Sequence, residues 1–270
     1  MAASRWRSRR GRAKGDFWLV ATLGYPSLGL DLELGPRTWR DRLASQVLRT
    51  GLTAIDQRFA AHAREHAQAL TVLTPALLST VASFEEVCMV DASTTLARRG
   101  SAHVLDTLSA FVRDVVATAK ELDGAVARVP APAALADDVP AWRAFAERFR
   151  GRLELGRMQV HDAVIGMDRV TLGTEWTRSG VVVGTRLRVA IDPPLAAPPA
   201  TCEDPALAPA ARAAWRELLA STRSLRIEPS ALVVEIGGTL ADPAAALPIV
   251  ELAVALRRSL SGLTGARPFR

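Results

Sequence analysis

The chain has 270 residues, of which 49% are hydrophobic and 23% are charged, an ordinary composition for a globular protein with length for one large domain or two average ones. Its formal net charge is +6, and residues 1–14 hold six basic residues and no acidic one. Subtracting these charges leaves residues 15–270 formally neutral. A domain that binds duplex nucleic acid usually carries its basic surface on the fold, so the charge argues against such a domain in the body of the chain.

Residues 1–15 are expected to form a disordered basic tail, because like-signed charges with few apolar residues cannot offset the entropic cost of ordering. The tail could contact a polyanion, either nucleic acid or an acidic membrane, and we expect that contact to be weak. The basic residues available for it are Arg5, Arg7, Arg9, Arg10 and Arg12.

The location of the protein is expected to be cytoplasmic. No apolar run reaches the ~18–20 residues of a membrane-spanning helix. Phe17–Leu30 mimics a short signal peptide, but Asp31 and Glu33 follow it, so we favour a β-hairpin and keep export or membrane association as the alternative. Cys88 and Cys202 indicate unpaired thiols in a reducing compartment. Frequent Arg, Ala and Pro with almost no Lys is typical of a GC-rich bacterial genome.

A first α+β unit is expected over residues 16–122. Apolar residues at period two predict strands there, and apolar residues at helical spacing predict helices. The predicted strands are 17–23, 28–34, 47–55, 87–90 and 94–98, and the predicted helices are 59–70, 74–84 and 101–122.

Residues 123–139 are rich in Ala and Pro and predict a linker, and a second α+β unit is expected over residues 140–264. Pro140, Pro209 and Pro243 suit the first turn of a helix and open three predicted helices. The predicted strands are 164–172, 181–191, 224–228 and 231–236, and the predicted helices run from 140 to 149, from 209 to 222 and from 243 to 260.

The expected fold class is α+β, with two tandem units that each pack helices on one face of an antiparallel sheet. Connections between neighbouring strands are too short for helical crossovers, which favours antiparallel pairing. Both halves end in a helix–strand–strand–helix order, and both have a predicted strand that ends in Ala-Ile-Asp, at residues 54–56 and 190–192. These features predict an internal duplication, with two unrelated α+β units as the alternative.

The core of the second unit is predicted from its apolar helix stripes and alternating strands. The residues expected to be largely buried are Trp215, Leu218, Leu219, Ile227, Val234, Val250 and Leu256.

A possible metal site is the H-x-x-E-H pattern formed by His62, Glu65 and His66. On a helix the two histidines would lie one turn apart and could both ligate Zn²⁺, with the glutamate beside them as a base. The pattern resembles the motif of the insulysin–pitrilysin peptidases, which implies a zinc-dependent hydrolase with a third, carboxylate ligand from downstream; Glu121 and Glu147 are the candidates. The alternative is an exposed helix face with two histidines and no catalytic metal.

Other candidate site residues carry weaker signals. Asp56 and Asp192 close the two Ala-Ile-Asp segments and could bind a shared ligand, although carboxylates at such places usually accept backbone hydrogen bonds. Trp176 lies between two predicted strands and is the aromatic residue most expected to mark a contact surface. Trp142 and Trp215 lie on apolar helix faces and are expected to pack in the core.

The sequence contains no recognisable nucleotide-binding or nucleophile motif, so the expected function is a non-catalytic binding or protein-interaction module without a cofactor. Its partner is expected to be a protein. The alternatives are a metal-dependent hydrolase built on the H-x-x-E-H helix and a polyanion binder that acts through the basic tail.

Overall fold

The structure is a computed structural model, and it describes residues 5–10, 17–38, 41, 47–101, 104–177 and 180–260, with the backbone alone described for 5–10. The chain divides into two compact units, Met1–Pro132 (unit 1) and Ala133–Arg270 (unit 2). Their boundary falls inside the predicted linker 123–139. Each unit is described by itself below.

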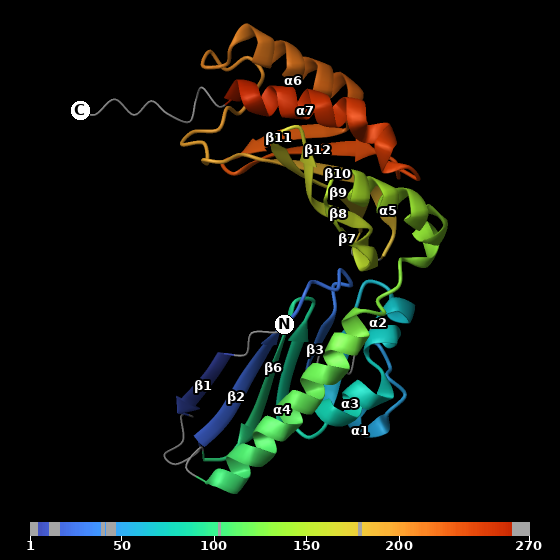
Figure 1. Cartoon of the computed structure of the whole chain (residues 1–270), viewed down its shortest axis with the longest axis vertical. Coiled ribbons are helices and arrows are strands. Elements are labelled where there is room, and N and C mark those ends of the chain that lie inside the picture. The colour runs from blue at the N-terminus through green and yellow to red at the C-terminus, as the bar shows by residue number, and fades with distance from the viewer. Residues whose placement is uncertain are drawn as a thin grey trace, which may run out of the picture. The chain divides into compact units, whose positions relative to one another are not determined.

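The described residues of unit 1 form one antiparallel sheet and four helices (Figure 1). Its strands follow the order β1-β2-β6-β5-β3-β4 across the sheet. The strands are β1 (Arg5–Arg10), β2 (Phe17–Gly24), β3 (Glu33–Pro36), β4 (Phe59–His62), β5 (Glu86–Val90) and β6 (Ser93–Arg99), and the helices are α1 (Thr53–Arg58), α2 (His66–Val72), α3 (Pro75–Val81) and α4 (Leu105–Val126).

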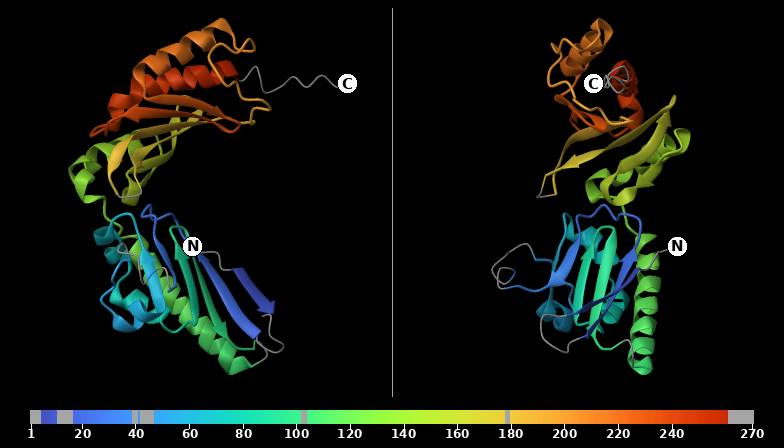
Figure 2. Two further views of the ribbon diagram at one scale, coloured as in Figure 1. Left: turned by 180° about the vertical axis from the view of Figure 1, so that it is seen from behind. Right: turned by 90° about the vertical axis from the view of Figure 1, so that its left-hand side faces the viewer.

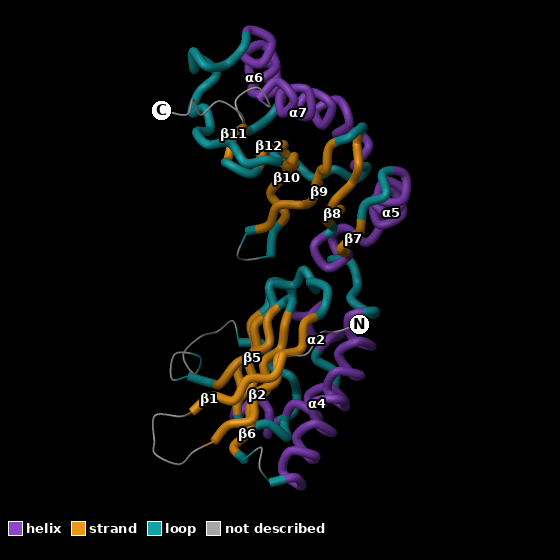
Figure 3. The backbone as a smooth tube through the Cα atoms, turned by 60° about the vertical axis from the view of Figure 1, so that its left-hand side comes forward, coloured by secondary structure: helices purple, strands orange, loops and turns teal. Residues whose placement is uncertain are grey.

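The helices of unit 1 cover one face of this sheet and leave the other face open (Figures 2 and 3). Local sequence explains α3, because Pro75 occupies its first turn and the Thr74 hydroxyl accepts a hydrogen bond from the Leu77 N–H at 3.2 Å. Alternation explains which face of each strand is buried: Val87 and Met89 point into the core, whereas Glu86, Cys88 and Val90 are exposed.

Unit 2 contains a second antiparallel sheet, in the order β11-β12-β10-β9-β8-β7 (Figure 1). Helices α6 and α7 lie over the β10–β12 part of one face, and α5 packs beside β7 and β8. The strands are β7 (Arg152–Glu154), β8 (Gln159–Ile165), β9 (Asp168–Trp176), β10 (Val182–Ala190), β11 (Ser224–Glu228) and β12 (Ala231–Gly237), and the helices are α5 (Val139–Arg148), α6 (Pro209–Ser221) and α7 (Leu247–Leu260), with short 3₁₀ turns η1 (Ala133–Asp138), η2 (Leu155–Arg157) and η3 (Pro243–Ala246).

The α+β class with helices on one face of antiparallel sheets is therefore confirmed. In the core of unit 2, Trp215, Leu218, Val234, Val250 and Leu256 are buried as predicted. Two core predictions need correction: Leu219 is 43% exposed and Ile227 is half-buried. Helix α6 buries the stripe Ala211, Trp215 and Leu218, which places Leu219 beside the buried face, and Ile227 lies on the edge strand β11.

Four predicted elements differ from the structure. The predicted strand 28–34 is reduced to β3 (Glu33–Pro36), which pairs with β4 and β5 and not with β2, so the predicted hairpin does not form. The predicted strand 47–55 is replaced by an isolated bridge at Leu48 and by α1. The predicted helix 59–70 is split into β4 and α2, because Phe59–His62 pairs with β3 and this long-range pairing overrides the local propensity. The predicted strand 164–172 is two strands, β8 and β9, joined at Gly166, whose φ of +65° suits a turn.

The predicted duplication is not confirmed, because the two sheets have different strand orders. The order helix–strand–strand–helix does occur in both units, as α3-β5-β6-α4 and as α6-β11-β12-α7. However, β5 lies inside its sheet, whereas its counterpart β11 is an edge strand. The two Ala-Ile-Asp segments also differ, since residues 54–56 belong to α1 and Ala190 ends β10.

The sequence assigned residues 1–15 to a disordered tail, whereas Arg5–Arg10 form β1 and pair with β2 along its length. Across the described part of the chain, no helix is both long enough and apolar enough to span a membrane.

Candidate functional site

The H-x-x-E-H pattern is not carried by one helix. His62 is the last residue of β4, Glu65 has an extended backbone just before α2, and His66 is the first residue of α2. The premise that both histidines share a helix face is therefore wrong. Of the proposed downstream ligands, Glu121 lies in α4 and Glu147 in α5, and the described residues contain no group of three His, Cys, Asp or Glu that could hold a metal ion.

His62 instead pairs with a carboxylate on the open face of unit 1. Its Nε2 lies 3.2 Å from Oδ1 of Asp41, and Glu33 is its direct cross-strand neighbour. Hydrogen bonds from the Thr38 hydroxyl and N–H, each 2.6 Å long, lower the pKa of Asp41 below its usual value, and His62 adds to this effect. These residues line a shallow hollow of about 360 Å³, with Cys88 on another part of its wall.

None of the other described residues singled out in the sequence is among those that line this hollow. Arg5, Arg7, Arg9 and Arg10 are in β1, and Arg12 lies outside the described residues. Asp56 accepts hydrogen bonds from the N–H and hydroxyl of Thr50, and the Asp192 carbonyl accepts one from Arg257. These two aspartates have structural roles that differ. Trp142 and Trp215 are buried in unit 2 as predicted.

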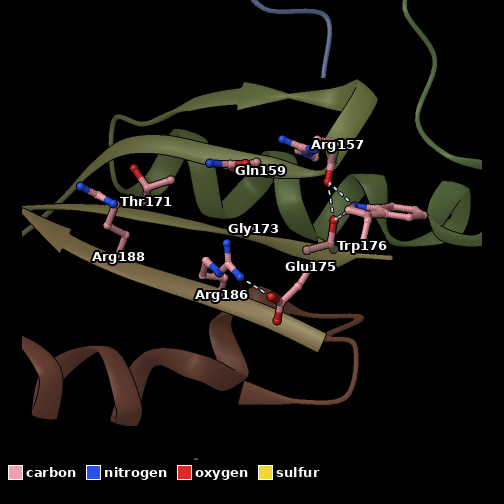
Figure 4. A pocket seen from close by; sticks show the side chains of 9 residues that line it. Arg157, Gln159, Thr171, Gly173, Glu175, Trp176, Arg186 and Arg188 are labelled. Carbon is pink, nitrogen blue, oxygen red and sulfur yellow. Dashed lines mark hydrogen bonds and ion pairs between the residues drawn. The ribbon is translucent and has the colours of Figure 1, made fainter. Parts of the chain in front are cut away.

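Trp176 lines the second hollow, which lies in unit 2 and has a volume of about 320 Å³ (Figure 4). Its indole Nε1 donates to the Thr174 hydroxyl at 2.6 Å and approaches the Arg157 carbonyl at 3.4 Å. The Thr174 hydroxyl also donates to that carbonyl. These bonds fix the tryptophan ring against the short turn η2, so this wall of the hollow is preformed. The described residues that line the hollow are Arg157, Gln159, Thr171, Gly173, Thr174, Glu175, Trp176, Arg186 and Arg188.

The floor of this hollow follows from the register of three strands. Gly173 of β9 is paired with Gln159 of β8 on one side and with Arg186 of β10 on the other. A Cβ atom at Gly173 would lie 2.6 Å from Cγ of Gln159, so the glycine leaves space that the glutamine side chain crosses. Thr171 and Arg188 form the next cross-strand pair. Period-two alternation thus puts Arg186 and Arg188 on the open face. Leu187, which lies between them, and Val189, which follows them, are buried.

Carboxylates beside the arginines hold the guanidinium groups in place. Nη2 of Arg186 pairs with Glu175 and lies 3.3 Å from Oε1 of Glu235, and Nη1 of Arg188 lies 3.1 Å from Oε2 of Glu228. Glu235 and Glu228 belong to β12 and β11, on the side of β10 away from the hollow. The arginine heads are therefore oriented at the edge of a region in which Thr171 and Gln159 are uncharged and Glu175 is paired with Arg186.

Glu235 is ionised at neutral pH because its surroundings favour the charged form. The Ser224 hydroxyl donates to its Oε2 at 2.8 Å, and this bond lowers the pKa of Glu235 most. Arg186 and Arg226 lower it further, while partial burial opposes them. Glu235 is thus a stable negative charge beside Arg186 and Arg226.

The arginine hollow was missed in the sequence, although Thr185–Val189 (TRLRV) alternates charged and apolar residues and could have been recognised as a strand with a basic open face. A comparison of the chain with known protein families, curated proteins and solved structures found no match.

Proposed function

We propose that this chain is a non-catalytic protein-interaction module and that the hollow on the open face of the unit 2 sheet binds an acidic segment of another protein. The observation that carries the proposal is the lining of the hollow, in which three arginines, Arg157, Arg186 and Arg188, outnumber one carboxylate, Glu175. Charge complementarity of this kind attracts and orients an acidic partner.

Arg186 retains donors for a ligand. A guanidinium has five N–H donors in a planar fork, and carboxylates match that fork closely. The two carboxylate pairs of Arg186 both use Nη2. These pairs also restrict the side chain before a ligand arrives, which lowers the entropy lost on binding. Glu175 is engaged in holding Arg186, so it suits a positioning role better than that of a catalytic base.

A protein partner fits this face better than a nucleic acid. Glu175, Glu228 and Glu235 lie among the arginines and would repel a long polyphosphate that extends beyond the hollow. Exposed apolar side chains also lie at the same end of the sheet as Trp176: Val181 is 57% exposed and Val183 is 36% exposed. Apolar and aromatic contacts next to arginine are typical of protein interfaces.

The test is binding of fluorescent poly-L-glutamate to the full chain, measured by fluorescence anisotropy. The double substitution Arg186→Gln and Arg188→Gln should weaken binding about tenfold or more, which is 1.4 kcal/mol or more. Glutamine removes the charge without adding repulsion against the three glutamates. Raised salt should also weaken the binding of poly-L-glutamate to the unmodified chain.

The matched control is Arg143→Gln, because Arg143 is an exposed arginine on α5 of the same unit. It should leave the affinity unchanged. A second control replaces Arg5, Arg7, Arg9 and Arg10 by Gln, which tests the polyanion alternative. Loss of binding in that variant, with the Arg186/Arg188 variant unaffected, would assign poly-glutamate binding to the N-terminal arginines and refute the hollow.

A further inference from the structure

We infer that the segment bound on unit 2 is an extended peptide with acidic side chains at every second residue and an apolar residue about four residues beyond its last acid. The inference rests on the proposed function and specifies the partner of the same hollow. It is drawn from the spacing of the arginines, from the side on which their counter-charges lie, and from the apolar end of the sheet.

The spacing of the two arginines matches an extended chain. Arg186 and Arg188 are two residues apart on β10 and point to the same face, and residues at this separation in a strand lie roughly 6.5–7 Å apart. An extended peptide has the same repeat, and its residues at positions i and i+2 also share one face. A helical ligand would bring acidic residues to one face at i and i+3 or i+4, which does not match this repeat.

The side of approach is set by the fixed carboxylates. Glu228 and Glu235 hold the arginines from the β11 and β12 side. On the β9 and β8 side, the paired residues Thr171, Gly173 and Gln159 carry no charge, and the one carboxylate among the described lining residues, Glu175 of β9, forms an ion pair with Arg186. An acidic peptide that lies over β9 therefore meets both arginines and remains separated from those two glutamates by β10.

The apolar end of the sheet lies within reach of the same peptide. Val182 is paired with Trp176, and a register shift follows it, so that Val183 is an additional residue in β10. Val182 is four residues from Arg186, a distance of roughly 13 Å along a strand. An extended peptide whose acidic residues face Arg186 and Arg188 can thus place an apolar side chain against Trp176, Val181 or Val183 about four residues beyond its last acid.

The experiment compares fluorescent peptides of equal composition on the full chain. One repeats Glu-Ser four times and the other repeats Glu-Glu-Ser-Ser twice, and each is followed by Ser-Ser-Leu-Leu. In the extended form the first peptide puts all four glutamates on one face, whereas the second puts two on each face. The alternating peptide should bind about tenfold more tightly, and removal of the two leucines should reduce this affinity about threefold.

Two variants identify the site. Arg188→Gln should abolish most of the preference for the alternating peptide, and Trp176→Phe should reduce the contribution of the leucines, because phenylalanine lacks the Nε1–H that holds the ring. Arg143→Gln should change neither quantity. A further arm uses a single-stranded oligothymidylate of eight nucleotides, which presents a regularly charged backbone without carboxylates.

The possible outcomes separate the two proposals. Equal affinity for the two peptides, with binding still lost in the Arg186/Arg188 double variant, would overturn the alternating geometry and leave the acidic-partner function standing. Binding of all peptides that is unaffected by the double variant would overturn both. Tighter binding of the oligothymidylate than of the alternating peptide, dependent on the same arginines, would replace the peptide by a nucleic-acid ligand.

Discussion

The open faces of the two sheets differ in chemistry although the sheets share one architecture. In unit 1, Thr22, Thr95 and Cys88 form a neutral cross-strand row, with 3.3 Å between the two threonine hydroxyls. In unit 2, a cross-strand pair on the open face contains an acidic and a basic residue, Glu235 and Arg186. Burial dictates apolar residues on the helix-covered side of both sheets. The open sides are free of that requirement, so their residues can differ between the two units.

The two hollows show the same contrast in charge. Among the residues that the structure describes, those that line the unit 1 hollow include Glu33, Asp41 and His62 but neither Lys nor Arg. The described lining of the unit 2 hollow contains three arginines and a single glutamate. An acidic ligand is therefore expected to bind unit 2 and not unit 1. Substitutions in the helix-covered core, which both units share, should change stability, whereas substitutions on the open sheet faces, where the units differ, should change binding.

The largest loss in the free energy of unfolding is expected from a substitution in the helix-covered core, which both units have. Leu218 of α6 is fully buried, and truncation of such a leucine removes its burial energy and leaves a cavity. Leu218→Ala should lower the free energy of unfolding by about 2–5 kcal/mol. Urea denaturation followed by the fluorescence of the tryptophans measures it.

The control for that substitution is its neighbour Leu219, which is 43% exposed. Leu219→Ala should cost less than about 1 kcal/mol, because its side chain already contacts solvent. A larger loss for Leu219 than for Leu218 would mean that α6 packs through a different face. Binding of acidic peptides should survive both substitutions wherever the fold is retained, since neither leucine lines the arginine hollow.

The helix-covered side of each unit was largely predictable from the sequence. The stripe through Trp215 and Leu218 and the alternation in β12 are local patterns, so they identify the buried face without knowledge of neighbouring elements. The assignment failed where partners distant in sequence decide the structure. Phe59–His62 became a strand because β3 offered it a pairing edge, and local periodicity contains no information about that edge.

The candidate site was less predictable than the fold. Trp176 was singled out in the sequence as a residue expected to mark a contact surface, and it lines the hollow. Arg186 and Arg188 were not singled out, because Arg is abundant throughout the chain, and only the register shows that Arg186 lies between Glu235 and Gly173. The H-x-x-E-H pattern, in contrast, was singled out on a wrong premise. Its five residues suggested a helix, but the backbone changes from strand to helix within them.

A smaller effect is expected from paired glycine substitutions on the two open faces. A Cβ atom at Gly35 in unit 1 would meet nothing within 4 Å, whereas one at Gly173 in unit 2 would lie 2.6 Å from Gln159. Gly35→Ala should stabilise the protein by about 0.4–1 kcal/mol, because alanine reduces the entropy of the unfolded chain. Thermal and urea unfolding measure this change.

Gly173→Ala should give a smaller gain or none, because Gln159 must move. It should also weaken acidic-peptide binding, since the new methyl group occupies the floor of the hollow, while Gly35→Ala leaves that affinity unchanged. Equal stabilisation by the two substitutions, with unchanged binding in both, would show that the floor of the unit 2 hollow is not used.

The smallest change in the free energy of unfolding is expected at Glu235, the carboxylate beside Arg186. The folded pKa of Glu235 lies below the unfolded value of about 4.3, so its contribution to stability is complete above that pH and is lost as the pH falls through the folded pKa. Ser224→Ala removes the bond that lowers the pKa most and should raise it towards the usual value. The variant should lose about 0.5 kcal/mol at neutral pH and nothing at low pH.

The measurement is the free energy of urea unfolding at about pH 7 and about pH 3, compared between the unmodified chain and the variant. The matched substitution in unit 1 is Thr38→Ala, which removes the hydroxyl bond to Asp41 and should act on its pKa in the same direction. An unchanged pH dependence in Ser224→Ala would mean that Arg186 and Arg226 suffice to keep Glu235 ionised. In that case Arg186→Gln should raise the pKa of Glu235 instead, and the ion pairs rather than Ser224 would set the charge of the unit 2 face.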